Sequence, residues 1–168
     1  MRDLRAYLPT TWLGPRSVLA LRYTEARARG RTEPFQLGGA TDDLLQLGPT
    51  LNNRTLSLRG YLGDEPALRG ASARVATVEW RTPLWDIDRH AMVPAVGNNR
   101  LSATVFMDVG GAWNTGDGPA AWRRGVGLEL LGEEKLLYAL GLQLCLGVAQ
   151  GLDPPKDTRA YLKAGSAF

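Results

Sequence analysis

The sequence predicts an all-β protein, a sheet of antiparallel strands whose two faces have different surroundings. Twenty glycines and ten prolines in 168 residues favour strands joined by turns over helices. Apolar and polar side chains alternate along residues 100–113, where Asp108 lies in the middle of the more polar face. Residues 136–149 carry an unbroken apolar row at every second position. A helix would scatter that row around its circumference and would include two interior glycines at about 1 kcal/mol each.

Seven strands are expected, and they are joined by one long loop and several shorter connections. The strands fall at residues 2–8, 16–27, 72–82, 100–113, 122–131, 136–149 and 158–168. Pro9 ends the first strand and Pro83 ends the third. The other connections are a connector at 84–99, a turn at 114–121 and a hairpin at 131–135. The long loop, residues 30–70, is rich in Gly, Pro and Asn and too long for an idle connection, so we expect it to be functional or disordered.

The alternation assigns Glu79 and Asp108 to the polar side of two adjacent strands. Later strands place small, polar or charged residues on the same side, such as Gly125, Glu129, Gln143, Arg159 and Lys163. This pattern suits a wet barrel lumen and suits solvent almost equally well. Four tryptophans fall at predicted strand ends, as in the interfacial belts of membrane barrels: Trp12, Trp85, Trp113 and Trp122. Soluble β-sandwiches also carry tryptophan at strand ends, so the residues alone leave both architectures open.

Composition argues against several classes of function. The formal charge of +3 comes from basic residues spread along the chain, which does not favour nucleic acid. His90 is the only histidine, so neither a metal site nor a catalytic triad is expected, and no cofactor is implied. Cys145 is interpreted as a small apolar strand residue. The first ten residues lack the apolar region of a signal peptide, and no apolar run reaches the roughly 18 residues of a helical span.

Five short motifs, in order along residues 34–168, resemble the barrel of one membrane-protein family. They are Phe35-Gln36-Leu37-Gly38-Gly39, Leu58-Arg59-Gly60-Tyr61, Val78-Glu79-Trp80-Arg81-Thr82-Pro83-Leu84, Phe106-Met107-Asp108-Val109-Gly110 and Gly165-Ser166-Ala167-Phe168. The family is the outer-membrane protein assembly-factor superfamily of the BamA/TamA type, also called the bacterial surface antigen domain. Two departures are an insertion at 39–58 and a second Leu-Arg-Gly at 68–70 that lacks the aromatic residue.

The resemblance implies a transmembrane β-barrel of sixteen strands in the bacterial outer membrane, of which this chain supplies about the last seven. We therefore expect a partial barrel domain over residues 1–168, belonging to a longer protein or assembly. The long loop would fold inward and place Arg59 between Glu79 and Asp108, where a guanidinium binds carboxylates in bidentate geometry. Gly60 would permit a tight turn and Tyr61 would pack at the loop tip.

The resemblance also assigns Gly110 to the strand motif that receives the loop. Gly165 and Phe168 would belong to a C-terminal signal that the assembly machinery recognises. No catalytic residue is implied, and the expected function is insertion or translocation of polypeptides across the outer membrane. The partners would be outer-membrane lipid, unfolded outer-membrane or secreted polypeptides, and components of the assembly machinery.

Two alternatives remain open at this point. The chain is alternatively a barrel anchor or secretion module for a fused soluble domain, such as the patatin-like lipases that carry a similar barrel. A soluble β-sandwich binding module is the third reading. Sequence upstream of Met1 separates the first two, because periplasmic transport-associated repeats favour assembly and a G-x-S-x-G lipase domain favours the anchor.

Overall fold

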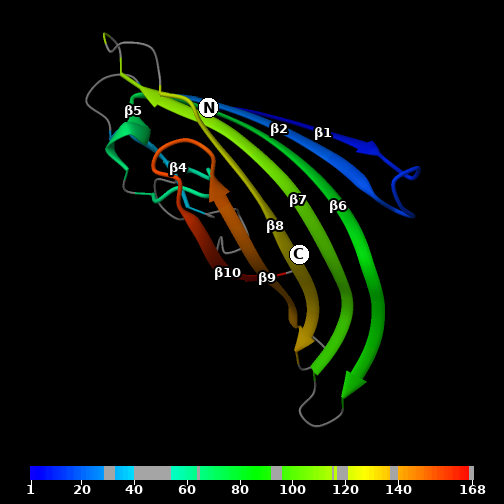
Figure 1. Cartoon of the computed structure of the whole chain (residues 1–168). Helices are drawn as coiled ribbons and strands as arrows, with labels where there is room; N and C mark the ends of the chain where they lie inside the picture. The colour runs from blue at the N-terminus through cyan, green and yellow to red at the C-terminus, as the bar shows by residue number, and fades with distance from the viewer. Residues whose placement is uncertain are drawn as a thin grey trace.

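The computed structural model describes residues 1–28, 33–39, 54–63, 65–91, 96–114, 116, 121–136 and 140–166. Within them, seven strands form one curved antiparallel sheet in the order β1-β2-β6-β7-β8-β9-β10 (Figure 1). Their bounds are β1 Arg2–Pro9, β2 Val18–Arg27, β6 Ser72–Ala91, β7 Val96–Trp113, β8 Arg123–Leu136, β9 Leu140–Gly151 and β10 Thr158–Ser166. Each strand pairs with its neighbours in antiparallel register. The predicted all-β, seven-stranded antiparallel class is confirmed.

The described part of the long loop is folded and packs on the concave side of the large sheet (Figure 1). It contains a small sheet in the order β4-β3-β5 and one turn of 3₁₀ helix. The bounds are β3 Phe35–Leu37, β4 Thr55–Leu56, η2 Pro66–Leu68 and β5 Arg69–Gly70. Most of the insertion expected at 39–58 lies outside the described residues.

The described part of the loop supplies most of the buried apolar core. Leu37, Leu58 and Leu68 are fully buried, and they pack with residues at one end of the large sheet. The large-sheet members of this core are small or β-branched: Ala26, Ala73, Val75 and Ala112. Small side chains on the concave face leave room for a second layer, so the loop and the sheet close on each other there.

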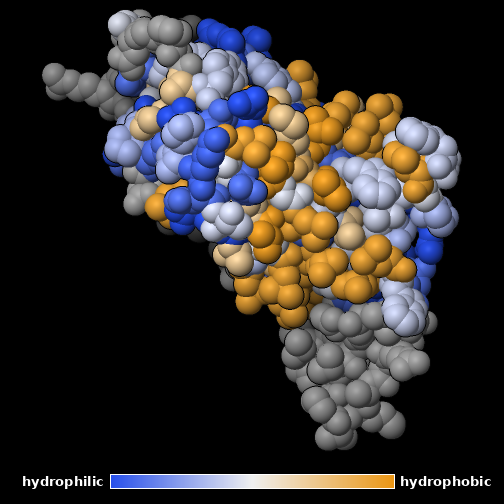
Figure 2. Space-filling model, viewed as in Figure 1, coloured by the Kyte–Doolittle hydropathy of each residue, from blue (hydrophilic) through white to orange (hydrophobic). Residues whose placement is uncertain are grey.

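The large sheet buries one set of alternating side chains and exposes the other, except in β1, where all eight residues are exposed. On β7, Thr104, Phe106 and Asp108 are at most 7% exposed, whereas Val105 and Met107 are 47% and 40% exposed. The rest of the exposed set is also apolar and includes Val78, Leu128, Leu130, Leu144, Leu146, Val148 and Leu162. Figure 2 shows a continuous apolar area over the middle of the molecule. The alternation predicted from the sequence is therefore present in the structure.

Three predicted boundaries are wrong, because strands continue where turns were expected. β6 runs through Pro83 to Ala91 and β7 begins at Val96, so most of the connector at 84–99 is strand. The ladder shifts register between Pro83 and Trp85, and such an irregularity accommodates a residue without an N–H group. Residues 131–135 also belong to β8, and they pair there with residues of β9. Local breaker signals were outweighed by pairing with the neighbouring strands.

The predicted location of the tryptophans at strand ends is confirmed in part. Trp113 ends β7, Trp122 directly precedes β8 and Trp12 lies in the turn between β1 and β2, whereas Trp85 lies inside β6. β9 begins at Leu140, later than expected, and β10 ends at Ser166, so Phe168 lies outside the described residues. Over the described ranges, no helix has the length and apolarity needed to cross a membrane.

Candidate functional site

Among the described residues, one loop arginine is the most deeply buried cationic side chain. Arg59 follows β4 and is 2% exposed. Its Nε and Nη2 atoms each donate to one oxygen of Asp108, both at 2.8 Å, and its backbone N–H also donates to Asp108, at 3.1 Å. Asp108 lies on β7 and is 1% exposed. This is the planar bidentate geometry in which a guanidinium binds a carboxylate most strongly.

Two further carboxylates complete the surroundings of Arg59. Glu79 on β6 lies 2.8 Å from Nη2, and Glu129 on β8 lies 3.3 Å from Nη1. The ring of Phe106 stacks under the guanidinium, with 3.5 Å between the ring centroid and Cζ. The expected contacts of Arg59 with both Glu79 and Asp108 are present. The stacking was not expected, because the sequence showed only that Phe106 shares a face with Asp108.

The charges of this cluster balance. Burial lowers the pKa of Arg59, but the hydrogen bonds and charge of Asp108, and then the charges of Glu79 and Glu129, outweigh burial and raise that pKa well above its ordinary value. Glu79 and Glu129 each have a second cationic partner: Arg81 forms an ion pair with Glu79 at 2.5 Å, and Lys163 forms one with Glu129 at 2.8 Å. Three cations thus meet three carboxylates. We call these six residues the latch network.

Glu129 extends the network to the last described strand. It accepts hydrogen bonds from Tyr161 at 2.5 Å and from Lys163 at 2.8 Å, and both donors lie on β10. β9 separates Glu129 from Tyr161, and the residue directly between them is Gly147. A Cβ at position 147 would overlap the Tyr161 ring, so only glycine lets the phenol cross β9. The sequence placed Glu129 and Lys163 on the polar face but did not identify them as site residues.

The loop tip is seated by backbone geometry and by one phenol. Gly60 has φ +95°, and a Cβ there would lie 2.8 Å from the backbone nitrogen of Gly151. Tyr61 is 2% exposed, and its hydroxyl donates to the carbonyl oxygen of Arg124 at 2.8 Å. The same hydroxyl accepts a hydrogen bond from the backbone N–H of Asp153 at 3.0 Å. The tip is therefore held against the end of the sheet where β8 begins and β9 ends.

The side chain of Leu37 packs closely against Gly110, another of the predicted glycines. A Cβ at Gly110 would lie 2.9 Å from Cδ2 of Leu37, so this glycine admits the loop core. The structure thus brings Gly110 to the same loop as Arg59, Gly60 and Tyr61. Gly165 lies apart from them, in β10 opposite Gln143 on β9. Phe168, the other residue of the expected C-terminal signal, is not among the described residues.

The described residues contain no group of three or more His, Cys, Asp or Glu able to hold a metal ion. Cys145 is buried on β9 on the same face as the latch network. The arrangement of the cluster is that of a charge-compensated clasp between a loop and a sheet. Comparison of the chain with protein-family models, with curated proteins and with solved structures gave no match.

Proposed function

We propose that this chain is part of an outer-membrane β-barrel of the assembly and translocation type, which inserts or translocates polypeptides. The observation that carries the proposal is the seating of Arg59, a loop residue, on carboxylates from three neighbouring strands. The resemblance to the assembly-factor superfamily implies the same partners for this arginine, Glu79 and Asp108. Residues far apart in sequence thus meet in the arrangement that the motifs imply.

The outward face supports lipid as its surroundings. Its side chains are apolar and exposed, from 37% at Leu130 to 66% at Leu162. Soluble monomers rarely expose an apolar area of this extent, whereas the outer surface of a membrane barrel requires one. The strands β6 to β9 have 12 to 20 residues, more than the roughly 9 to 11 that a tilted strand needs to cross a bilayer.

The latch network would hold the loop inside the barrel and brace the strands that it touches. Its balanced charges offset the cost of burying ions in the seated state, because each buried charge has an opposite one beside it. Separating the loop from the wall leaves buried charges without partners, so partial release is costly. The loop therefore has two favoured states, seated or fully withdrawn into water, and withdrawal would open the concave side to a polypeptide.

Location and activity are tested separately. The complete gene product should fractionate with the outer membrane and migrate faster on gels before boiling than after it, because closed barrels resist detergent until heated. Purified protein in liposomes should then speed the folding of an urea-denatured outer-membrane polypeptide relative to empty liposomes. Recovery as a compact soluble monomer would contradict the membrane location. Membrane location without any acceleration would contradict the assembly role and favour the barrel anchor.

A further inference from the structure

Three arginines gather on the outward face of the large sheet, at the end where β2 ends and β6 begins (Figure 1). They lie on three neighbouring strands: Arg2 on β1, Arg27 on β2 and Arg74 on β6. Glu25 on β2 lies between them. Arg2 and Arg74 are its opposite residues on the two flanking strands, and Arg27 follows it by two positions. By this register all four share the face of the exposed apolar residues, and we call them the basic patch.

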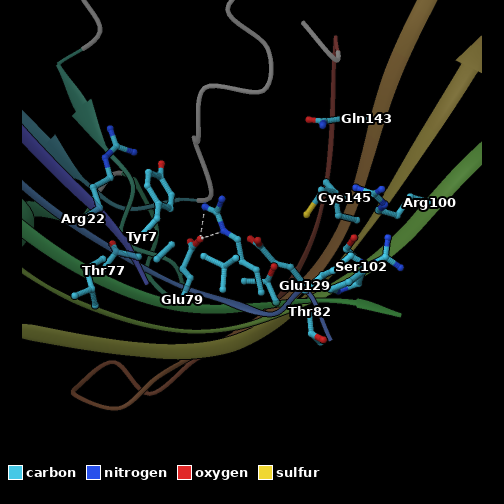
Figure 3. Close-up of a pocket in the computed structure, with 18 of the residues that line it drawn as sticks. Tyr7, Arg22, Thr77, Glu79, Thr82, Arg100, Ser102, Glu129, Gln143 and Cys145 are labelled. Carbon is cyan, nitrogen blue, oxygen red and sulfur yellow. Dashed lines mark hydrogen bonds and ion pairs between the residues drawn. The ribbon is translucent and has the colours of Figure 1, made fainter. Parts of the chain in front are cut away.

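The basic patch is separate from the cationic residues of the concave side. Figure 3 shows Arg22 and Arg100 among the residues that line a hollow there. Arg22 forms an ion pair with Asp3 at 3.1 Å, and Arg100 forms one with Asp86 at 2.9 Å. The four residues of the patch do not line this hollow. Their charge is therefore presented to the surroundings of the outward face.

Positive charge exceeds negative charge in the patch. Among the described residues, Glu25 is the one carboxylate that pairs with these arginines, with Arg27 at 2.8 Å and with Arg74 at 2.9 Å. Arg2 is exposed, and within the described ranges the structure shows no side-chain hydrogen bond or ion pair for it. Three guanidinium groups and one carboxylate leave two positive charges on this part of the sheet.

The arginines of the patch also retain hydrogen-bond donors. A guanidinium has five N–H donors. Arg27 donates to Glu25 from one nitrogen, and its side chain is 62% exposed. Arg74 donates from Nε and Nη2 to the same oxygen atom, Oε1, and its side chain is 35% exposed. Donors of both arginines are therefore available to a ligand while the bonds to Glu25 stay in place.

The patch is small enough for one ligand group to reach all of it. Adjacent strands lie about 4.8 Å apart, so the backbones of Arg2 and Arg74, with β2 between them, are about 10 Å apart. Arg27 lies about 7 Å from Glu25 along β2. Arginine side chains are long and flexible, so the three guanidinium groups can converge on a single phosphate group.

The patch borders directly on the apolar part of the outward face. The next residues of that face, two positions away on each strand, are exposed and lie opposite one another: Leu4, Tyr23 and Ala76. Beside the patch, the guanidinium of Arg74 lies 5.3 Å from the ring centroid of Trp113, which ends β7. Tryptophan rings are enriched where a membrane meets water. A ligand that fits this surface has an anionic end next to an apolar one.

We propose that the basic patch binds the phosphate group of an anionic membrane lipid, whose acyl chains lie on the adjacent apolar residues. Arginine binds phosphate strongly, because its planar donors match two phosphate oxygens at once. A soluble phosphate compound gains only these bonds, whereas a lipid also covers Leu4 and Tyr23. The proposal rests on the membrane location in the proposed function, and it adds a lipid site in the leaflet that meets the loop end of the sheet.

The test measures lipid binding to the complete gene product in neutral detergent micelles by native mass spectrometry. Phosphatidic acid supplies the phosphate head group, and phosphatidylcholine with the same acyl chains is the zwitterionic comparison. Phosphatidic acid should bind about 10- to 30-fold more tightly, as expected for two uncompensated arginine charges. Equal binding of the two lipids would overturn the proposal. Displacement of phosphatidic acid by equimolar glycerol phosphate would overturn it in favour of a soluble ligand.

A double variant locates the site. Arg27→Gln combined with Arg74→Gln leaves only Arg2 beside Glu25, so the patch loses its excess positive charge. Binding of phosphatidic acid should weaken about 5- to 30-fold, and binding of phosphatidylcholine should change little. Unchanged affinity for phosphatidic acid in this variant would overturn the assignment.

The matched control is Arg16→Gln combined with Arg100→Gln. These two exposed arginines likewise share one carboxylate, Asp86, but they line the hollow of the concave side. The control changes the total charge by the same amount and should change the affinity for phosphatidic acid less than about 2-fold. Equal losses in the two double variants would show a general charge effect and overturn the assignment.

Arg2→Gln is a second variant for the case in which the double variant does not fold. Its replacement breaks no side-chain bond that the structure shows among the described residues. It should weaken phosphatidic acid binding about 3- to 5-fold, and unchanged affinity would overturn the site of three arginines. Heat-dependent gel migration reports that each variant has formed its barrel.

Lipid binding and polypeptide assembly are measured independently. A protein that fractionates with the outer membrane and speeds client folding, but binds both lipids equally, refutes the lipid site alone. A protein that prefers phosphatidic acid, but does not speed client folding, refutes the assembly role alone.

Discussion

Replacing Arg59 by alanine tests the latch network most directly. The hydrogen bonds that the structure shows to Asp108 all come from Arg59. In the variant, by contrast, Glu79 keeps its ion pair with Arg81 and Glu129 keeps its ion pair with Lys163. The loss therefore falls on Asp108, which is 1% exposed. Leaving one member of a buried ion pair uncompensated costs about 3 to 5 kcal/mol. This corresponds to a loop-opening equilibrium roughly 10² to 4 × 10³ times more favourable.

Hydrogen exchange of the amides in residues 54–63, measured on the protein in micelles, reports this opening. Asp108→Asn should cost less, about 1 to 2 kcal/mol, because Arg59 retains Glu79 and Glu129. The double variant should cost about 2 kcal/mol less than the sum of the two, since the second change removes the charge that the first left unpaired. Lysine at position 59 should restore protection only partly, because an ammonium lacks the planar fork.

Arg54→Ala is the matched control. Arg54 belongs to the same loop and lies over the ring of Phe35 at 5.6 Å, but it donates to the backbone carbonyl of Glu33 in place of a carboxylate. It should cost less than about 1 kcal/mol. If the Arg59 and Asp108 variants were additive, or if Arg54→Ala opened the loop as far as Arg59→Ala, the reasoning from the buried ion pair would be refuted.

Three further substitutions probe the surroundings of the loop. Glu129→Gln should speed exchange of the β10 amides about tenfold, because Lys163 loses its buried carboxylate. Residues 54–63 should stay protected, since Arg59 keeps Asp108. Unchanged β10 exchange would argue against the link between Glu129 and β10. Gly125→Ala should displace the loop and make it sensitive to protease, since the new Cβ would overlap the Arg59 carbonyl oxygen. Gly63→Ala is the control and should leave the loop resistant, because the nearest atom to its Cβ lies at 3.9 Å. Tyr61→Phe should destabilise the seated loop by about 1 to 2 kcal/mol in the same exchange assay, because the Arg124 carbonyl and the Asp153 N–H lose their partner. Full protection of residues 54–63 in this variant would contradict the seating of the tip.

The alternation of side chains was enough to predict the strands and the facing of their residues. Period two is a local property of the chain, and it placed Asp108 and Phe106 on one face of their strand and Met107 on the other. The structure shows that the first face is buried and the second is exposed. The same argument put Glu79 and Asp108 on the same side of two adjacent strands, and these strands, β6 and β7, do pair with each other. Some predicted strand ends were wrong, as at Pro83, where a residue that usually ends a strand lies inside one. Pairing with the neighbouring strands along a long ladder outweighs the conformational preference of one residue.

The tertiary structure alone decided how the loop meets the wall. Nothing periodic connects Arg59 to the strands, and the expectation that it lies between two acids came from a resemblance in short motifs. The third acid, Glu129, and its link to Tyr161 depend on strand register and on the absence of a side chain at Gly147. Register across three strands is set by all their pairings together, so a single sequence does not reveal which polar residues of one face touch.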